Sequence, residues 1–148
     1  MGADQSGLIQ KELTEAVIRA FFAVYNELGH GFLEQVYENA LAVALRELDI
    51  DVRQQVAVNV YFRGHRVGEY RADLLVPDRL LIEVKAATTL APGHEAQMVN
   101  YLRATGIPVG LLLNFGPRPQ MKRRVHSGKN PLLSAPIRPD PRTKTNVQ

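Results

Sequence analysis

The first third of the chain repeats its apolar residues at the spacing of an α-helix. In LTEAVIRAFFAVYNELGHG, residues 13–31, one helical face is apolar, and Thr14 is placed to cap the amino end. Gly29 and Gly31 are stop signals, because glycine is favoured just beyond the carboxyl end of a helix. A second helix is predicted over residues 33–48, after a very short turn. The apolar positions of the two helices are Val17, Ile18, Phe21, Val24, Tyr25, Leu28, Val36, Tyr37, Ala40, Leu41, Ala44, Leu45 and Leu48.

The apolar period then changes from 3.6 residues to two. Residues 52–62 alternate and predict a strand, an RGHR turn follows, and residues 67–76 return as a second strand. PDR at 77–79 is a second turn, because proline favours such turns, and LLIEVKA is the third strand. Residues 92–105 predict a helix ended by Gly106, PVGLLLNF is typical of a strand covered on both faces, and MKRRV is a candidate final strand. This order predicts an α/β fold, in which helices flank a mixed sheet of antiparallel hairpins.

The length of 148 residues fits one domain with a sizeable core. We expect an N-terminal extension (1–12), a folded domain (13–126) and a basic, proline-rich tail (127–148) that is disordered. The absence of cysteine excludes disulfides and thiolate metal sites. No signal-peptide pattern and no apolar run of membrane-spanning length is present, so we expect a cytoplasmic protein without a membrane partner.

The net charge of +3 is distributed unevenly along the chain. Residues 116–148 hold eight Lys or Arg and one acid, whereas the first 115 residues hold ten basic and 14 acidic residues. The overall charge is therefore weak support for nucleic-acid binding. The simplest interpretation of the basic tail is a solvated segment.

Three charged residues are set into the apolar hairpin ADLLVPDRLLIEVKA, residues 72–86, namely Asp73, Glu83 and Lys85. Counting outward from the turn at 77–79 sets Asp73 opposite Glu83, and Lys85 shares a strand face with Glu83. Residues opposite each other in an antiparallel pair have Cβ atoms about 5 Å apart. Two carboxylates at that separation repel, so the pair must share a proton, gain a cation partner or bind a metal ion.

A hard divalent cation would neutralise these acids, and ligation by oxygen alone suits Mg²⁺ or Mn²⁺. The carbonyl of Val84, between the charged positions, can add a further ligand. Lys85 can then orient or deprotonate a water polarised by the metal. The alternative is a salt-bridged strand on a solvated face, with Lys85 paired to Glu83 or Asp73.

The start of the second helix repeats Gly31, Glu34 and Tyr37 at steps of three residues, which share one helix face. Glu34 is a candidate metal ligand, although an acid in the first turn is also favourable for the helix dipole alone. Tyr37 is a candidate supporting residue near the substrate, and its alternative is a core aromatic residue with its hydroxyl at the boundary.

The third helix places His94, Gln97 and Tyr101 on one polar face. Such a face can grip a substrate phosphate or support the metal ligands, and its alternative is a solvated helix surface. For His94 alone we favour a helix-start or surface position.

The ordered set of these residues resembles the GxxExxY family, a branch of the PD-(D/E)xK nuclease superfamily, over about residues 13–125. The resemblance implies a restriction-endonuclease-like core in which Asp73 and Glu83 bind Mg²⁺ and Lys85 serves the attacking water. It also implies that an acid matching Glu34 completes the site. The helix with Gln97 and Tyr101 resembles the Q-x-x-x-Y element of RecB-like nucleases, which helps to organise the site and DNA. The chain departs from the superfamily pattern at Ala72, where proline stands in the superfamily name.

Two functions remain open from the sequence. The first is a metal-dependent nuclease that hydrolyses phosphodiester bonds of nucleic acid, with DNA the expected substrate and Mg²⁺ (or Mn²⁺) the cofactor. The second is a non-catalytic module that keeps the fold and binds nucleic acid or protein. A purely structural domain leaves the facing acids unexplained. The small core also suggests a homodimer or a protein partner, which would help to enclose DNA.

Overall fold

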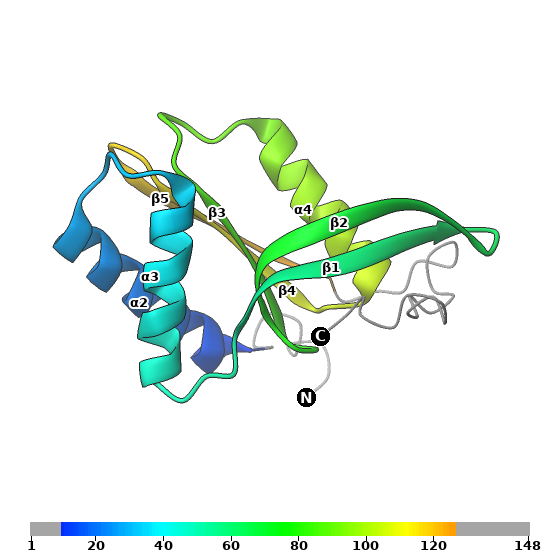
Figure 1. Ribbon diagram of the computed structural model, residues 1–148, viewed down its shortest axis with the longest axis horizontal. Coiled ribbons are helices and arrows are strands. Elements are labelled where there is room, and N and C mark those ends of the chain that lie inside the picture. The colour runs from blue at the N-terminus through cyan, green and yellow to red at the C-terminus, as the bar shows by residue number, and fades with distance from the viewer. Residues whose placement is uncertain (1–9, 127–148) are drawn as a thin grey trace.

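The computed structural model describes residues 10–126, which form three helices and a five-stranded mixed sheet (Figure 1). The predicted α/β class is confirmed, and so is the order of the helices and strands. The predicted tail, 127–148, and most of the predicted N-terminal extension lie outside the described residues. The elements are α2 (Lys11–Leu28), α3 (Glu34–Glu47), β1 (Arg53–Phe62), β2 (His65–Val76), β3 (Leu80–Lys85), α4 (Pro92–Thr105), β4 (Val109–Phe115) and β5 (Pro119–Val125).

The strands follow the order β1-β2-β3-β4-β5 across the sheet. The β3–β4 pair is parallel and the other three pairs are antiparallel. Because parallel neighbours need a crossover connection, α4 links β3 to β4 across one face of the sheet. Every residue of β4 is buried, as its unbroken apolar run predicts.

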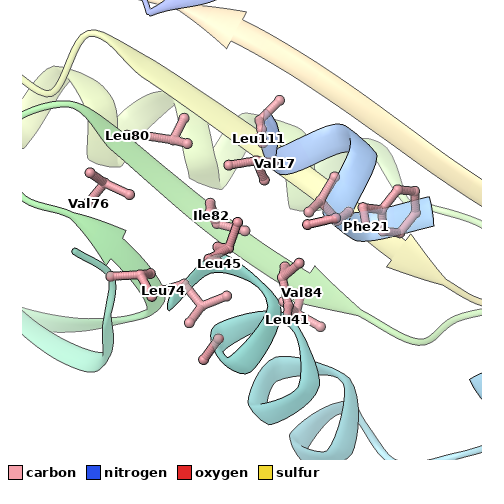
Figure 2. Close-up of a cluster of buried hydrophobic side chains, with 14 of the residues drawn as sticks. Val17, Phe21, Leu41, Leu45, Leu74, Val76, Leu80, Ile82, Val84 and Leu111 are labelled. Carbon is pink, nitrogen blue, oxygen red and sulfur yellow. The ribbon is translucent and has the colours of Figure 1, made fainter. Parts of the chain in front are cut away.

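Each face of the sheet has its own apolar core. On one face α2 and α3 pack against the sheet through residues such as Phe21, Leu41 and Ile82 (Figure 2). On the other face α4 packs through Met98 and Leu102 on a second core. The functional side chains discussed below come from the ends of the elements that enclose these two cores. None of the helices in residues 10–126 is long and apolar enough to cross a membrane.

The predicted cap at Thr14 is wrong, because α2 begins one turn earlier, at Lys11. Thr14 is buried inside the helix, and its hydroxyl donates to the carbonyl of Lys11 at 3.0 Å. Hydroxyl groups that bond back into the preceding turn are compatible with a helix interior. The predicted ends at Gly29 and Gly106 are confirmed, and both glycines have positive φ angles, of 69° and 78°.

Two residues assigned to the apolar face of α3 are exposed. Val36 has 38% and Leu48 has 53% of its surface exposed, whereas Tyr37, Leu41 and Leu45 are fully buried. The apolar stripe of α3 that meets the core is therefore narrower than the sequence pattern predicts.

Candidate active site

The pairing between β2 and β3 confirms the register counted from the 77–79 turn for three pairs, ending at Leu74 opposite Ile82. The ladder ends before Asp73 and Glu83, so these residues do not form the next backbone pair that the sequence predicts. Instead, the carboxylate of Asp73 accepts a hydrogen bond from the backbone N–H of Val84 at 2.8 Å. A side-chain oxygen thus replaces a strand carbonyl at the point where β2 and β3 separate.

A local reversal in β1 and β2 turns polar side chains toward α3. Leu74 belongs to the core under α2 and α3, whereas Ala72 belongs to the core under α4, although residues two apart normally share a face. Across the pair, Gln55 has a positive φ of 52°. Its amide donates to Glu38 on α3 at 2.7 Å and to Asp73 at 3.3 Å. The reversal therefore joins Asp73 to α3 through Gln55.

Glu83, the acid of β3, is buried, with 8% of its surface exposed. Burial raises the pKa of its carboxyl group to about 8, the positive charge of Lys85 opposes that shift, and the charges of Glu34 and Glu38 add to it. The Oε2 atom of Glu83 is buried and has no hydrogen-bond partner within residues 10–126. A buried oxygen without a partner is costly, so this position favours a proton or a cation.

Lys85 lies two residues beyond Glu83 and shares its strand face, because side chains alternate along a strand. Lys85 is half-buried, whereas Ile82 and Val84 point to the opposite face and into the core under α2 and α3. The predicted placement of the lysine beside Glu83 is consistent with its effect on the pKa of that carboxyl group.

The G-x-x-E-x-x-Y pattern covers the loop before α3 and the first turn of that helix. Gly31 has a φ of 117°, a conformation that favours glycine. The hydroxyl of Tyr37 donates to the carbonyl of Gly29 at 2.5 Å and accepts from the N–H of Phe32 at 3.2 Å. Tyr37 is fully buried, so its hydroxyl holds the loop that leads into Glu34.

Glu34, the first residue of α3, reaches across to the end of β3. Its carboxylate accepts a hydrogen bond from the backbone N–H of Ala86 at 3.3 Å. The side chain of Glu34 is exposed, and its charge acts on the buried carboxyl group of Glu83. The structure therefore brings Glu34 to the same strand end as Glu83 and Lys85.

Glu38 is a fourth acid of the cluster, and the sequence reasoning missed it. It is only 3% exposed, and its carboxylate accepts hydrogen bonds from the amides of Gln54 and Gln55 at 2.9 and 2.7 Å. Burial raises the pKa of Glu38, the two amide hydrogen bonds oppose this, and the charges of Asp73 and Glu34 add to it. Glu38 could have been found from its spacing of four residues from Glu34, because residues four apart share a helix face.

Asn114 is a second residue that the sequence reasoning missed. It is fully buried on β4, and its amide both accepts from the N–H of Ala87 at 2.8 Å and donates to the carbonyl of Ala87 at 2.9 Å. Its amide also donates to Gln120 on β5 at 3.0 Å. Asn114 thereby fixes the chain two residues beyond Lys85.

The polar residues of α4 lie apart from the contacts of the acidic cluster. Gln97 is exposed and Tyr101 is half-buried, and both line a groove between α4 and the β1–β2 hairpin. Tyr101 stacks on Tyr70 of β2, with ring centroids 3.5 Å apart. His94 accepts a hydrogen bond from the N–H of Ala91 at 3.3 Å, which matches the favoured helix-start position.

The side chains at the end of β3 fit a hard divalent cation in chemistry. The acids there offer only carboxylate oxygen atoms, they outnumber the single lysine, Lys85, and Glu83 holds an unpartnered oxygen. Within residues 10–126, no three acidic or histidine side chains stand close enough together to hold an ion as they are. Binding a cation therefore requires the carboxylates to approach each other further.

Comparison with known proteins assigns the family. A family model described as the PD-(D/E)XK nuclease superfamily matches residues 11–125. No curated protein matches the chain. Among solved structures, one titled "Crystal structure of SSO0001" matches with 20% sequence identity and a TM-score of 0.48. That match covers 79% of this chain and 59% of that one. Since the family model spans most of its length, the chain belongs to the PD-(D/E)XK nuclease superfamily.

Proposed function

We propose that this protein is a metal-dependent nuclease that hydrolyses phosphodiester bonds of nucleic acid, with DNA as the expected substrate. The observation that carries the proposal is the buried, unpartnered oxygen of Glu83 on the same strand face as Lys85. Membership of a nuclease superfamily supports the same reaction class.

Asp73, Glu83, the carbonyl of Val84 and Glu34 are the proposed ligands of Mg²⁺ or Mn²⁺. When bound, the cation supplies Lewis acidity, which stabilises negative charge on the phosphate and lowers the pKa of bound water. Glu38 lies behind these ligands and holds Gln55, which in turn holds Asp73. We therefore assign Glu38 a positioning role.

Lys85 is the proposed partner of the attacking water. Its Nζ atom orients that water or accepts its proton while the water oxygen forms the new bond to phosphorus. The bond from phosphorus to the leaving sugar oxygen breaks in the same displacement. Lys85 shares a strand face with Glu83, and Asn114 fixes the chain just beyond it.

Tyr37 and the α4 residues have different proposed roles. Because Tyr37 is fully buried and bonds to the loop before Glu34, it acts by positioning that acid. Gln97 and Tyr101 line an accessible groove, so they are proposed to contact the substrate.

The test is cleavage of single- and double-stranded DNA and RNA with Mg²⁺, with Mn²⁺ and with EDTA. We expect metal-dependent cleavage. Lys85→Ala should reduce it by about 10²- to 10⁴-fold, the usual contribution of a positioned proton-transfer group. Glu83→Gln should also reduce it, because it removes a charged ligand of the proposed metal. Lys122→Ala, which removes an exposed lysine from β5, should retain full activity. Cleavage that survives Glu83→Gln or Lys85→Ala would rule out the proposed roles, and no cleavage of any substrate would rule out the nuclease.

A further inference from the structure

A groove of about 590 Å³ lies between the β1–β2 hairpin and α4. The hairpin extends well beyond the other strands, and α4 passes beneath it (Figure 1). A volume of this size falls within the range of small-molecule sites and is large enough for a nucleotide. The residues that matter for its chemistry are Val60, Val67, Gly68, Gln97, Asn100 and Tyr101.

The groove offers an aromatic surface with amide groups beside it. Tyr101 stacks on Tyr70 at an interplanar angle of 13°, so its ring is held in a fixed orientation. Gln97 and Asn100 are exposed side-chain amides, and each can both donate and accept hydrogen bonds. Val67, on the hairpin side, is 61% exposed. Apolar surface with a few polar groups suits a flat heterocycle, because a base stacks through its face and bonds through its edge.

The turn of the hairpin carries a cation next to an aromatic ring. Arg63 stands in this turn, whereas Arg66 and Arg71 of β2 lie on the strand face away from α4. Arg66 donates to Asn59 at 3.1 Å, and Arg71 stands between Tyr70 and Ala72, which belong to the core under α4. The guanidinium group of Arg63 stacks over the exposed ring of Phe62 at 4.8 Å from its centroid. A cation stacked on an exposed aromatic ring suits the phosphates and bases of a single strand.

The groove opens on the same sheet face as the proposed catalytic residues. Leu81 lies in the core beneath α4, and Glu83 and Lys85 follow it at steps of two residues. A strand of nucleic acid held between the hairpin and α4 therefore lies on the face that carries Lys85.

We propose that this groove binds an unpaired base of the substrate, and that the protein accordingly prefers single-stranded nucleic acid. This inference rests on the proposed nuclease function, whose substrate class it names. A base within a duplex is stacked and paired, and moving it out of the stack costs a few kcal/mol. A single strand enters the groove without that cost.

The test measures binding in EDTA, so that no cleavage is needed for a result. The probe is a fluorescent oligothymidine of about 12 nucleotides, compared with a duplex of the same length, and the readout is fluorescence anisotropy. Gly68→Leu fills the groove, because a Cβ atom at Gly68 would meet no atom within 4 Å. Tyr101→Ala removes the stacking surface and Tyr101→Phe restores it. His65→Leu adds a leucine to the same strand, at an exposed position outside the groove.

We expect the wild type to bind the single strand more tightly than the duplex. Gly68→Leu and Tyr101→Ala should weaken single-strand binding by about 5- to 150-fold, since stacking contributes about 1–3 kcal/mol per base. Tyr101→Phe and His65→Leu should bind like the wild type, and duplex binding should not change.

Wild-type binding of the single strand by Gly68→Leu would overturn the proposal, and so would an equal loss on single strand and duplex. If Tyr101→Ala fails to fold, Gly68→Leu decides the result alone. Failure of the nuclease proposal has a different signature, in which the groove variants weaken binding but the wild type cuts no substrate with Mg²⁺ or Mn²⁺.

Discussion

Replacing Glu83 with glutamine should remove a pH-dependent cost that the buried carboxyl group imposes on folding. The pKa of Glu83 rises from 4.5 to about 8 on folding, chiefly through burial. Between these two values the folded protein binds more protons at this site than the unfolded chain does. The contribution of Glu83 to the free energy of unfolding is therefore fully present below about pH 4.5, and it is lost as the pH rises toward 8.

The size of the effect follows from the shift. One pKa unit corresponds to about 1.4 kcal/mol, so the shift amounts to a loss of at most about 5 kcal/mol for the wild type. Glutamine has nearly the same shape as glutamate and no charge to bury. The free energy of unfolding of Glu83→Gln should therefore not fall in this way as the pH rises. At alkaline pH without metal ions, the variant should be the more stable protein by several kcal/mol.

The assay is urea unfolding in EDTA at about pH 5 and about pH 9 for both proteins, with the free energy of unfolding taken from linear extrapolation. The difference between the two proteins isolates Glu83, because Glu38 and the other titrating groups are common to both. Glu47→Gln, at an exposed position of the same α3 helix, is the matched control and should follow the wild type. An equal loss of stability in wild type and Glu83→Gln between the two pH values would refute the burial reasoning.

Three further outcomes are expected. Mg²⁺ at about 100 times its dissociation constant should stabilise the wild type by about 2.7 kcal/mol, and differential scanning fluorimetry should find no such shift for Asp73→Ala. Asn114→Ala leaves the N–H and carbonyl of the half-buried Ala87 without their side-chain partner, so chemical unfolding should show a loss of about 2–4 kcal/mol in the free energy of unfolding. Tyr37→Phe should lower the free energy of unfolding by about 1–3 kcal/mol. Cleavage assays should also show reduced turnover, because Glu34 is misplaced. Unchanged stability would contradict the role of the Tyr37 hydroxyl.

The fold was predictable because its strongest signals are local and agree with one another. The helical period before Gly29, the RGHR and PDR turns and the apolar run of β4 each select one element. The register at the second turn follows from counting, because a hairpin turn fixes the pairing of both strands. These signals come from neighbouring residues, so tertiary structure has little room to override them.

The parts that the sequence did not predict arise from contacts between distant segments. The positive φ of Gln55 is stabilised by packing of β1 and β2 against α3, and no glycine or asparagine marks it in the sequence. Glu38 reads as an ordinary helix acid until Gln54 and Gln55 bury it. Asn114 stands in an apolar run, and only the fold shows that its amide pairs with the backbone of Ala87.

Some charged residues of the candidate site could be chosen from the sequence, but their geometry could not be predicted. The charged residues of β2 and β3 stand out in an apolar hairpin, so Asp73, Glu83 and Lys85 could be chosen from the sequence. Their predicted direct opposition fails because the strands separate at Asp73, whose carboxylate takes the N–H of Val84. The repulsion that the sequence assigned to Asp73 and Glu83 comes instead from Glu34 and Glu38.

A crystal structure of the wild type with Mn²⁺ tests the proposed metal site most directly, through the anomalous scattering of manganese. We predict a peak in contact with the carboxylates of Asp73 and Glu83 and the carbonyl of Val84, at about 2.1 Å from each oxygen. The same peak should be absent from crystals of Glu83→Gln. No peak at the end of β3, under conditions in which the protein cleaves nucleic acid, would contradict a catalytic metal at this site.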